Sequence, residues 1–148
     1  MPAKMAQKAN TSQKTAVDWP LLVDADFDRN ARVLLVEDDR STRRLVSSAL
    51  KDFCQLIEAP DASQGITAYN AFRPDIVFLD IALPDGDGHH LLDWIMRNDP
   101  GAFVVMFSGH NDTDTILKSV DTGAKGFVVK PFDVNKMLYF IRSCPRMH

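Results

Sequence analysis

The sequence predicts an α/β fold built on a doubly wound, five-stranded parallel sheet with helices on both faces. From Arg32 onward, short apolar runs alternate with amphipathic helical patterns, as in successive βα units. Three of the runs are nearly continuous, which is typical of strands covered on both faces. Charged residues follow several of these runs, at the sheet edge where such folds bind ligands.

Five segments have the length and composition of strands. They cover residues 32–37, 55–59, 75–79, 103–107 and 126–129. The third, fourth and fifth are the nearly continuous apolar runs, so we expect them to be buried on both faces. Parallel strands joined by helices imply right-handed crossovers.

Helices are expected after each strand, because apolar residues recur there at spacings of three and four. The predicted apolar stripes are Thr42, Leu45, Val46, Ala49 and Phe53; Ala62, Ile66, Tyr69 and Phe72; Leu91, Leu92, Ile95 and Met96; Ile116, Leu117 and Val120; and Val134, Met137, Leu138 and Ile141. Stop signals agree with these positions: Pro74 follows the second helix, Pro100 the third and Gly123 the fourth.

Length and composition indicate one globular domain. The chain has 148 residues and a formal net charge of −3, which gives no general attraction to nucleic acid or to anionic membranes. No apolar stretch approaches the ~20 residues that span a bilayer, and the basic N-terminus is not followed by a secretory signal pattern. Cys54 and Cys144 match neither a disulfide framework nor a metal-ligand spacing, so we expect reduced thiols and a cytoplasmic protein.

The N-terminal part of the chain differs in composition from the rest. We expect residues 1–30 to form an extension, partly disordered, to a domain that covers residues 31–148. Residues 1–16 are small, polar or basic and lack the apolar side chains needed for a core. Residues 17–28 include Trp19 and Phe27, which leaves open whether this segment docks on the domain, docks on a partner or stays loose.

Three acids and one lysine stand at the ends of expected strands. Glu37 and Asp38 follow the first strand, Asp80 the third and Lys130 the fifth. If these strands are neighbours, the charged groups meet at one sheet edge, where crowded carboxylates favour a bound cation such as Mg²⁺. A carboxylate held rigidly at a strand end can act as a nucleophile toward phosphorus, and a lysine can neutralise a phosphoryl oxygen.

Each residue alone is a weak signal, because Asp80 could cap the next segment and Lys130 could be a surface lysine. The acids after the first strand could cap the following helix, although Asp39 or Ser41 could do so unaided. The combination is far more specific. It closely resembles the receiver domain of two-component response regulators, of the stand-alone chemotaxis-regulator type, over residues from about 31 to 144, and the matching positions are Glu37-Asp38, Asp80 with Pro84 and Gly88, Ser108-Gly109, and Lys130-Pro131-Phe132.

The resemblance implies a flavodoxin-like strand order, 2-1-3-4-5, and a role for each matching residue. Asp80 would take a phosphoryl group from a sensor histidine kinase or a histidine phosphotransfer protein, with slow self-catalysed loss of the phosphate afterwards. Mg²⁺ would be held by Glu37, Asp38, Asp80 and the backbone carbonyl of Ala82, while Lys130 would hold the phosphoryl oxygens.

The resemblance also implies a switch. The hydroxyl of Ser108 would move to the phosphate and the ring of Phe127 would rotate inward, which would remodel the face formed by the fourth helix, the fifth strand and the fifth helix. A downstream protein target would read this face, and a homodimer through it is plausible. Only 15 residues follow Phe132-Asp133, too few for a DNA-binding output domain, so we expect no direct contact with nucleic acid.

Some positions depart from the common family pattern. Phe127 stands where tyrosine is frequent, so the hydrogen bond of that hydroxyl is lost. Ala82 and His110 occupy positions that tune phosphate lifetime in the family, although His110 is equally well interpreted as an exposed loop histidine. Tyr139 and Phe140 lie off the apolar stripe of the last helix and suit either a partner contact or packing against the N-terminal segment.

Three other classes of protein fit less well. A phosphatase with an aspartate nucleophile would carry a second aspartate at the position of Ala82. A flavin-binding protein would offer amides and hydroxyls after the first strand, where this chain has acids that repel phosphate. A receiver-like scaffold without phosphorylation would have lost the nucleophile, the acids or the lysine, and all are present.

Overall fold

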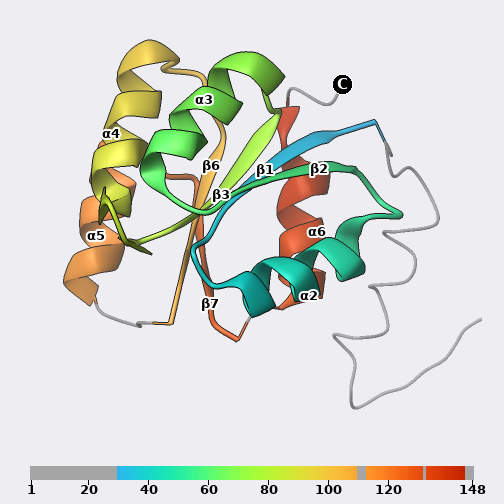
Figure 1. Cartoon of the computed structure of the whole chain (residues 1–148). Helices are drawn as coiled ribbons and strands as arrows, with labels where there is room; N and C mark the ends of the chain where they lie inside the picture. The colour runs from blue at the N-terminus through green and yellow to red at the C-terminus, as the bar shows by residue number, and fades with distance from the viewer. Residues whose placement is uncertain (1–29, 110–112, 132, 146–148) are drawn as a thin grey trace, which may run out of the picture.

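Five parallel strands form the central sheet of the computed structural model, which describes residues 30–109, 113–131 and 133–145 (Figure 1). The strands of this sheet are β1 (Arg32–Val36), β2 (Gln55–Ala59), β3 (Ile76–Asp80), β6 (Val104–Ser108) and β7 (Gly126–Val129). The helices are α2 (Arg40–Leu50), α3 (Ala62–Phe72), α4 (Gly88–Asn98), α5 (Thr113–Thr122) and α6 (Val134–Ser143). A short hairpin, β4 (Ala82–Leu83) and β5 (Gly86–Asp87), follows β3.

The strand order is β2-β1-β3-β6-β7, with every neighbouring pair parallel. Counted along the sheet's own strands this is the order 2-1-3-4-5, so the predicted doubly wound, flavodoxin-like fold is confirmed. The register aligns the carboxyl ends of the strands, because Val36 lies beside Leu79 and Asp80 beside Phe107. Residues that follow these ends therefore share one edge of the sheet.

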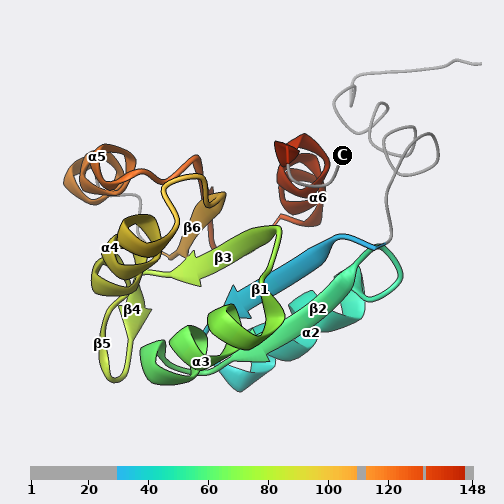
Figure 2. The same cartoon turned by 90° about the horizontal axis from the view of Figure 1, so that it is seen from above.

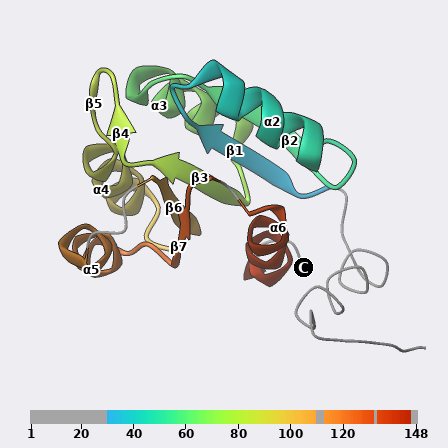
Figure 3. The same ribbon diagram turned by 90° about the horizontal axis from the view of Figure 1, so that it is seen from below.

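Successive residues of β1 enter two separate cores, one on each face of the sheet. Val33 and Leu35 lie in the core that α2 and α6 cover. Leu34 and Val36 lie in the core on the opposite face, which α3 and α4 cover. Figures 2 and 3 show this division from above and below, with α5 on the same side as α4. Burial on both faces explains why the central strands are apolar throughout.

Aspartate side chains begin three of the helices. Asp39 caps α2 by accepting from the Thr42 amide, Asp61 caps α3 through Gln64, and Asp133 caps α6 through Lys136. Such caps satisfy backbone N–H groups that the first helical turn leaves open. Asp39 is therefore the N-cap of α2, a role that Glu37 or Asp38 could also have taken. Glu37 and Asp38 are not needed as caps and can bind a ligand.

The predicted apolar stripes were wrong at several positions. Leu45, Leu117 and Val120 are 59%, 56% and 54% exposed, so they face solvent and not the core. Phe53 lies beyond the end of α2, where it packs against the α2/α6 core. A run of apolar residues at helical spacing covers a wide arc of the helix, and only its central part contacts the sheet.

The hairpin β4–β5 was not predicted, because its residues belong to none of the expected strands or helices. Its strands have two residues each and pair in antiparallel fashion, Ala82 with Asp87 and Leu83 with Gly86. Gly86 at the turn has φ of 154°, a conformation that favours glycine.

The last helix closes the α2/α6 core as predicted for most of its stripe. Met137, Leu138 and Ile141 are fully buried, and Tyr139 is exposed. Phe140 is half-buried and lies so close to Gly126 that a side chain there would overlap its ring. Phe140 therefore packs against β7 and the α2/α6 core, and the alternative contact with the N-terminal segment lies outside the described residues.

The two cysteines are buried free thiols, as expected. Burial raises the pKa of Cys54 to about 12, and the Cys144 thiol donates to the Asp75 carbonyl oxygen at 2.8 Å. Among the helices of the described segments, none has both the length and the apolar character needed to cross a bilayer.

Candidate functional site

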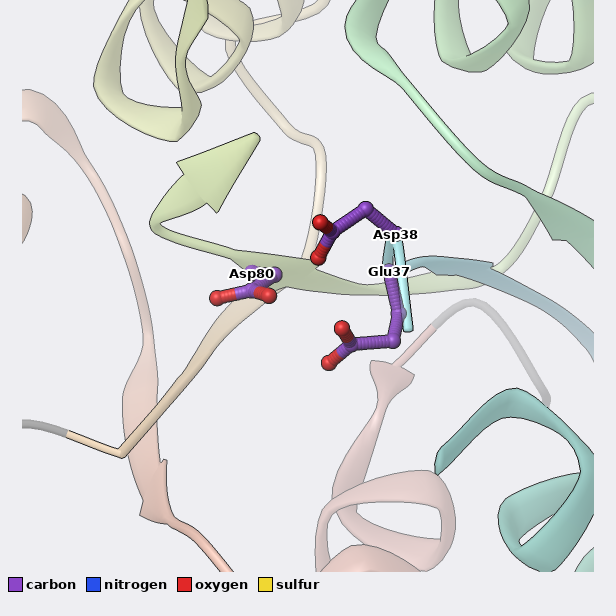
Figure 4. Close-up of side chains that lie close together, drawn as sticks. All are labelled: Glu37, Asp38 and Asp80. Atoms are coloured by element: carbon purple, nitrogen blue, oxygen red, sulfur yellow. The ribbon is translucent and has the colours of Figure 1, made fainter. Parts of the chain in front are cut away.

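Strands β1, β3 and β7 deliver charged residues to a single point at the carboxyl edge of the sheet. Glu37 and Asp38 follow β1, Asp80 ends β3, and Lys130 follows β7. Figure 4 shows the three carboxylates facing one another beyond the strand ends. The predicted juxtaposition of Glu37, Asp38 and Asp80 is thus what the structure contains.

The three acids form a cluster whose ligand atoms lie within 4.8 Å of one another. Glu37 is fully buried and Asp80 is 3% exposed, whereas Asp38 is exposed to solvent. The site therefore has two carboxylates fixed by the protein interior and a third at the solvent boundary. This arrangement leaves an entry for a ligand on the side of Asp38.

Both carboxylate oxygens of Asp80 have a partner in the protein. Oδ1 accepts from the backbone N–H of Ala82 at 3.1 Å, and Oδ2 accepts from the Lys130 ammonium at 3.0 Å. The first contact sets the direction in which the chain leaves β3, and the second comes from the far side of β6. Asp80 is thereby held in one orientation before any ligand arrives.

Lys130 is shared between two acids. Its Nζ lies 2.6 Å from Glu37 Oε1 and 3.0 Å from Asp80 Oδ2, and it also lies 5.3 Å from the centre of the Phe107 ring. Burial by itself would lower the pKa of Lys130, but the bonds to Glu37 and Asp80 outweigh it and raise that pKa. The lysine is therefore charged at neutral pH.

One ammonium does not neutralise this cluster. Burial raises the pKa of Glu37, and the contribution of Lys130 only partly offsets it. Desolvation, followed by the neighbouring Glu37, also raises the pKa of Asp38. Excess negative charge with partial desolvation is a setting that a bound cation relieves.

A buried acceptor supports the same conclusion. Within the described residues, Glu37 Oε1 has the close ion pair with Lys130 but no aligned hydrogen bond. Its other oxygen, Oε2, accepts from the Asp39 amide at 2.9 Å. Hard carboxylate oxygens with unused lone pairs are the donor set that Mg²⁺ takes, so the residues present fit a divalent cation.

Arg43 fixes the loop that carries the acids, a role that the sequence analysis missed. Its guanidinium donates to the carbonyl oxygens of Glu37 at 2.7 Å and Asp38 at 2.9 Å, and its Nε lies 3.4 Å from Glu58. Its place in the first turn of α2 was the available signal, since a side chain there reaches back over the β1–α2 loop.

Gly88 allows α4 to begin against the backbone of Asp80. A side chain at Gly88 would overlap the Asp80 carbonyl oxygen and lie 2.7 Å from Ile81 Cα. The Gly88 amide donates to the Ile81 carbonyl at 2.6 Å, which closes the base of the hairpin. A glycine here is a steric requirement of the site.

Comparison with known proteins assigns this arrangement to a family. The family model of the response regulator receiver domain matches residues 33–142. The chain belongs to this family. Receiver domains are signalling regulators of two-component systems, and this one is of the CheY-like type.

Relatives of this receiver domain include free-standing regulators and parts of longer proteins. The chain is 35% identical to the chemotaxis protein CheY of Listeria monocytogenes over 109 residues, 72% of this chain and 92% of that protein. The solved signal receiver domain of a putative Luxo repressor protein from Vibrio parahaemolyticus has a TM-score of 0.72 and 28% identity, covering 78% of this chain and 92% of that one. NtrX from Brucella abortus has a TM-score of 0.70 and 34% identity, covering 79% of this chain but 27% of the longer one.

The remaining predicted residues of the receiver domain have different outcomes. Ala82 is exposed at the start of β4, directly beside Asp80. Phe127 is half-buried and packs against the core beneath α3 and α4. Ser108 ends β6 but its side chain is outside the described part of the structure, and His110 lies outside the described residues altogether, as does the segment with Trp19 and Phe27.

Proposed function

We propose that this receiver domain is a phosphoacceptor switch, in which Asp80 takes a phosphoryl group from a phosphohistidine of a sensor kinase or a phosphotransfer protein. The observation that carries the proposal is the environment of Asp80. Its carboxylate sits at a strand end, fixed by the Ala82 amide and the Lys130 ammonium, and shares a cluster with two further acids. A fixed carboxylate beside a cation is equipped for nucleophilic attack on phosphorus.

Mg²⁺ is the expected cofactor, and the residues that would hold it are Glu37, Asp38, Asp80 and the carbonyl of Ala82. When bound, it would neutralise the acids and draw negative charge from the phosphoryl oxygens. Glu37 and Asp38 provide oxygen ligands from a loop that Arg43 fixes. These residues pre-organise the site, which is the main contribution a protein makes to phosphoryl transfer.

In the proposed transfer, Asp80 is the nucleophile and the histidine of the donor protein is the leaving group. A carboxylate oxygen of Asp80 forms a bond to phosphorus as the P–N bond of the phosphohistidine breaks, and its electron pair returns to the imidazole nitrogen. Lys130, which already contacts Asp80 Oδ2, then has a phosphoryl oxygen as a further acceptor. Hydrolysis by water later restores Asp80, and we propose that Ala82 and His110 influence its rate.

Output is proposed to pass through protein contacts at the face formed by α5, β7 and α6. Phosphorylation of Asp80 would draw the Ser108 hydroxyl toward the phosphate and let the Phe127 ring turn inward. Among the described residues, the large exposed apolar side chains are Leu45, Leu117, Val120, Val129 and Tyr139. All except Leu45 lie on α5, β7 or α6, which suits a downstream protein or a second copy of the chain.

We also propose that residues 31–148 form the receiver domain and that residues 1–30 form an N-terminal extension of it. The proposed regulator works without direct contact to nucleic acid. Size-exclusion chromatography with light scattering, before and after phosphorylation, tests the homodimer. A mass that stays monomeric after phosphorylation would leave a different protein as the occupant of the α5–β7–α6 face.

Intact-mass spectrometry tests the proposed function. The wild-type protein is incubated with acetyl phosphate, with and without Mg²⁺, beside the Asp80→Asn variant. We expect a gain of ~80 Da, one phosphoryl group, only when both Asp80 and Mg²⁺ are present. Absence of the gain with acetyl phosphate and with a phosphohistidine donor would instead favour a scaffold role.

A further inference from the structure

Asp85, at the tip of the β4–β5 hairpin, binds the N-terminus of a helix that begins 23 residues earlier. Its Oδ1 accepts from the backbone N–H of Ala62 at 2.8 Å, and its Oδ2 accepts from that of Ser63 at 3.0 Å. Ala62 and Ser63 are the first two residues of α3. The hairpin and the start of α3 also lie side by side in Figures 2 and 3.

This contact is additional to the helix's own cap. Asp61 already accepts from the Gln64 amide at 2.8 Å, and the Asp61 carbonyl accepts from Gly65 at 2.9 Å. A helix leaves about four N–H groups open at its start; the Asp61 side chain takes that of Gln64, and Asp85 takes those of Ala62 and Ser63. Those two backbone bonds also lower the pKa of Asp85, so its carboxylate is ionised at neutral pH.

Elsewhere in the hairpin, Leu83 of β4 packs against the core that α3 and α4 cover. The hairpin's ladder consists of two residue pairs, and a two-stranded ribbon of that length is not stable by itself. Its base is held on the β3 side by the bond from Ala82 N to Asp80 and by the bond from Gly88 N to the Ile81 carbonyl. Asp85 adds a support at the tip of the hairpin, on the far side of β1.

The contact between Asp85 and α3 spans the end of β1, where Glu37 and Asp38 lie. Strand β1 runs between β2, which leads into α3, and β3, which leads into the hairpin. The acids that follow β1 are therefore bracketed by α3 and the hairpin. Ala82, at the base of the hairpin, carries the carbonyl expected to complete the metal ligands.

We propose that Asp85 is a positioning residue for the metal site, which ties the hairpin to α3 and so fixes the Ala82 carbonyl relative to Glu37 and Asp38. The inference rests on the proposed function for the identity of the ligand, Mg²⁺. It adds a residue whose side chain touches neither the metal ligands nor the phosphoryl group in the described contacts. Loss of such an outer support costs metal affinity by factors of about 10 or more.

Asp85→Ala tests the inference, and Asp61→Ala is its matched control because it removes a cap from the same helix without touching the hairpin. Amide hydrogen exchange followed by NMR reads the contact itself. We expect Asp85→Ala to speed exchange at Ala62 and Ser63 and to spare Gln64. Asp61→Ala should do the reverse, with faster exchange at Gln64.

Titration with MgCl₂, followed by the amide shifts of residues 80–88, reads the consequence. We expect Asp85→Ala to raise the dissociation constant for Mg²⁺ about tenfold and Asp61→Ala to change it less than about twofold. Asp85→Asn keeps one oxygen acceptor, so it should give an intermediate value. Equal weakening by the Ala variants at positions 85 and 61 would mean general loosening of α3 and would overturn the inference, as would an unchanged constant in Asp85→Ala.

These outcomes separate the inference from the proposed function. A wild-type protein that gains a phosphoryl group while Asp85→Ala binds Mg²⁺ normally overturns the positioning role alone. A wild-type protein that binds Mg²⁺ in an Asp85-dependent way but gains no phosphoryl group overturns the phosphoacceptor function and supports the positioning role. Absence of Mg²⁺ binding in the wild type overturns both.

Discussion

The ammonium group of Lys130 donates a hydrogen bond to Asp80 Oδ2 across 3.0 Å, between residues 50 positions apart in the chain. The same nitrogen lies 2.6 Å from Glu37, so one cation links the ends of β1 and β3. The lysine thus holds together two acids that would otherwise repel each other. In the proposed switch, a phosphoryl group on Asp80 would be a third anionic partner of this ammonium and would weaken its contacts with the two carboxylates.

Replacement of Lys130 by Met should destabilise the protein. It leaves the fully buried Glu37 without its ion pair, and we expect a loss of about 2 kcal/mol in the free energy of unfolding, less than for a fully buried pair because Lys130 keeps 25% exposure. Urea unfolding measures this, with the exposed Lys125→Met as the control. Added Mg²⁺ should reduce the loss, since a second cation can neutralise the acids. A Lys130→Met protein as stable as the wild type without Mg²⁺ would contradict the role given to this ion pair.

Protons should compete with Mg²⁺ for Glu37 and Asp38 at a higher pH than they would for ordinary carboxylates. The pKa values of Glu37 and Asp38 are raised above their ordinary values of 4.5 and 3.8, so both acids take up protons earlier as the pH falls. We expect the affinity for Mg²⁺ to decline as the pH is lowered from about 7.5 through these raised values. Calorimetric titration at several pH values measures the decline.

The sign of the stability effect follows from the same shifts. Because the pKa of each acid is raised in the folded protein, ionisation of the acid lowers the free energy of unfolding. This destabilisation is complete at pH values above the raised pKa and absent at pH values below the ordinary pKa. Asp38→Asn should therefore raise the melting temperature slightly at neutral pH without Mg²⁺ while it weakens Mg²⁺ binding. A lower melting temperature with unchanged Mg²⁺ affinity would refute this account of the acids.

Gly88→Ala should destabilise the protein because the new methyl group overlaps the Asp80 carbonyl oxygen. Overlap with backbone forces local movement, and we expect a cost of about 2–3 kcal/mol together with slower phosphorylation. Gly101→Ala is the matched control, since the nearest atom to its new methyl group is Asp99 Oδ1 at 3.6 Å. Chemical denaturation of the two variants compares them, and equal stability would argue against a close approach of α4 to Asp80.

The fold and the centre of the site were predictable because their signals are local. Strands β1, β3 and β7 are short apolar runs that end in or lead into a charged residue, and the parallel topology then brings Glu37, Asp80 and Lys130 together. The cap at Asp39 follows from residue type and position alone. At each of these positions, one short segment determines both the conformation of the chain and the role of the residue.

The parts that escaped prediction depend on distant contacts. The β4–β5 hairpin has two-residue strands, too short for any alternation pattern, and its tie to α3 links Asp85 to residues that precede it by more than 20 positions. The exposure of Leu117 depends on how α5 is oriented against α4, where Ser119 bonds the buried His89 at 2.9 Å. No pattern within α5 encodes that orientation.

The position of the phosphoryl group on the chain tests the central claim most directly. The protein is phosphorylated with acetyl phosphate and Mg²⁺, reduced with sodium borohydride, which converts an aspartyl phosphate to homoserine, and mapped by peptide mass spectrometry. The account predicts homoserine at position 80 and none at position 38 or 85. Homoserine at another acid, or its formation elsewhere in Asp80→Asn at the wild-type rate, would contradict it.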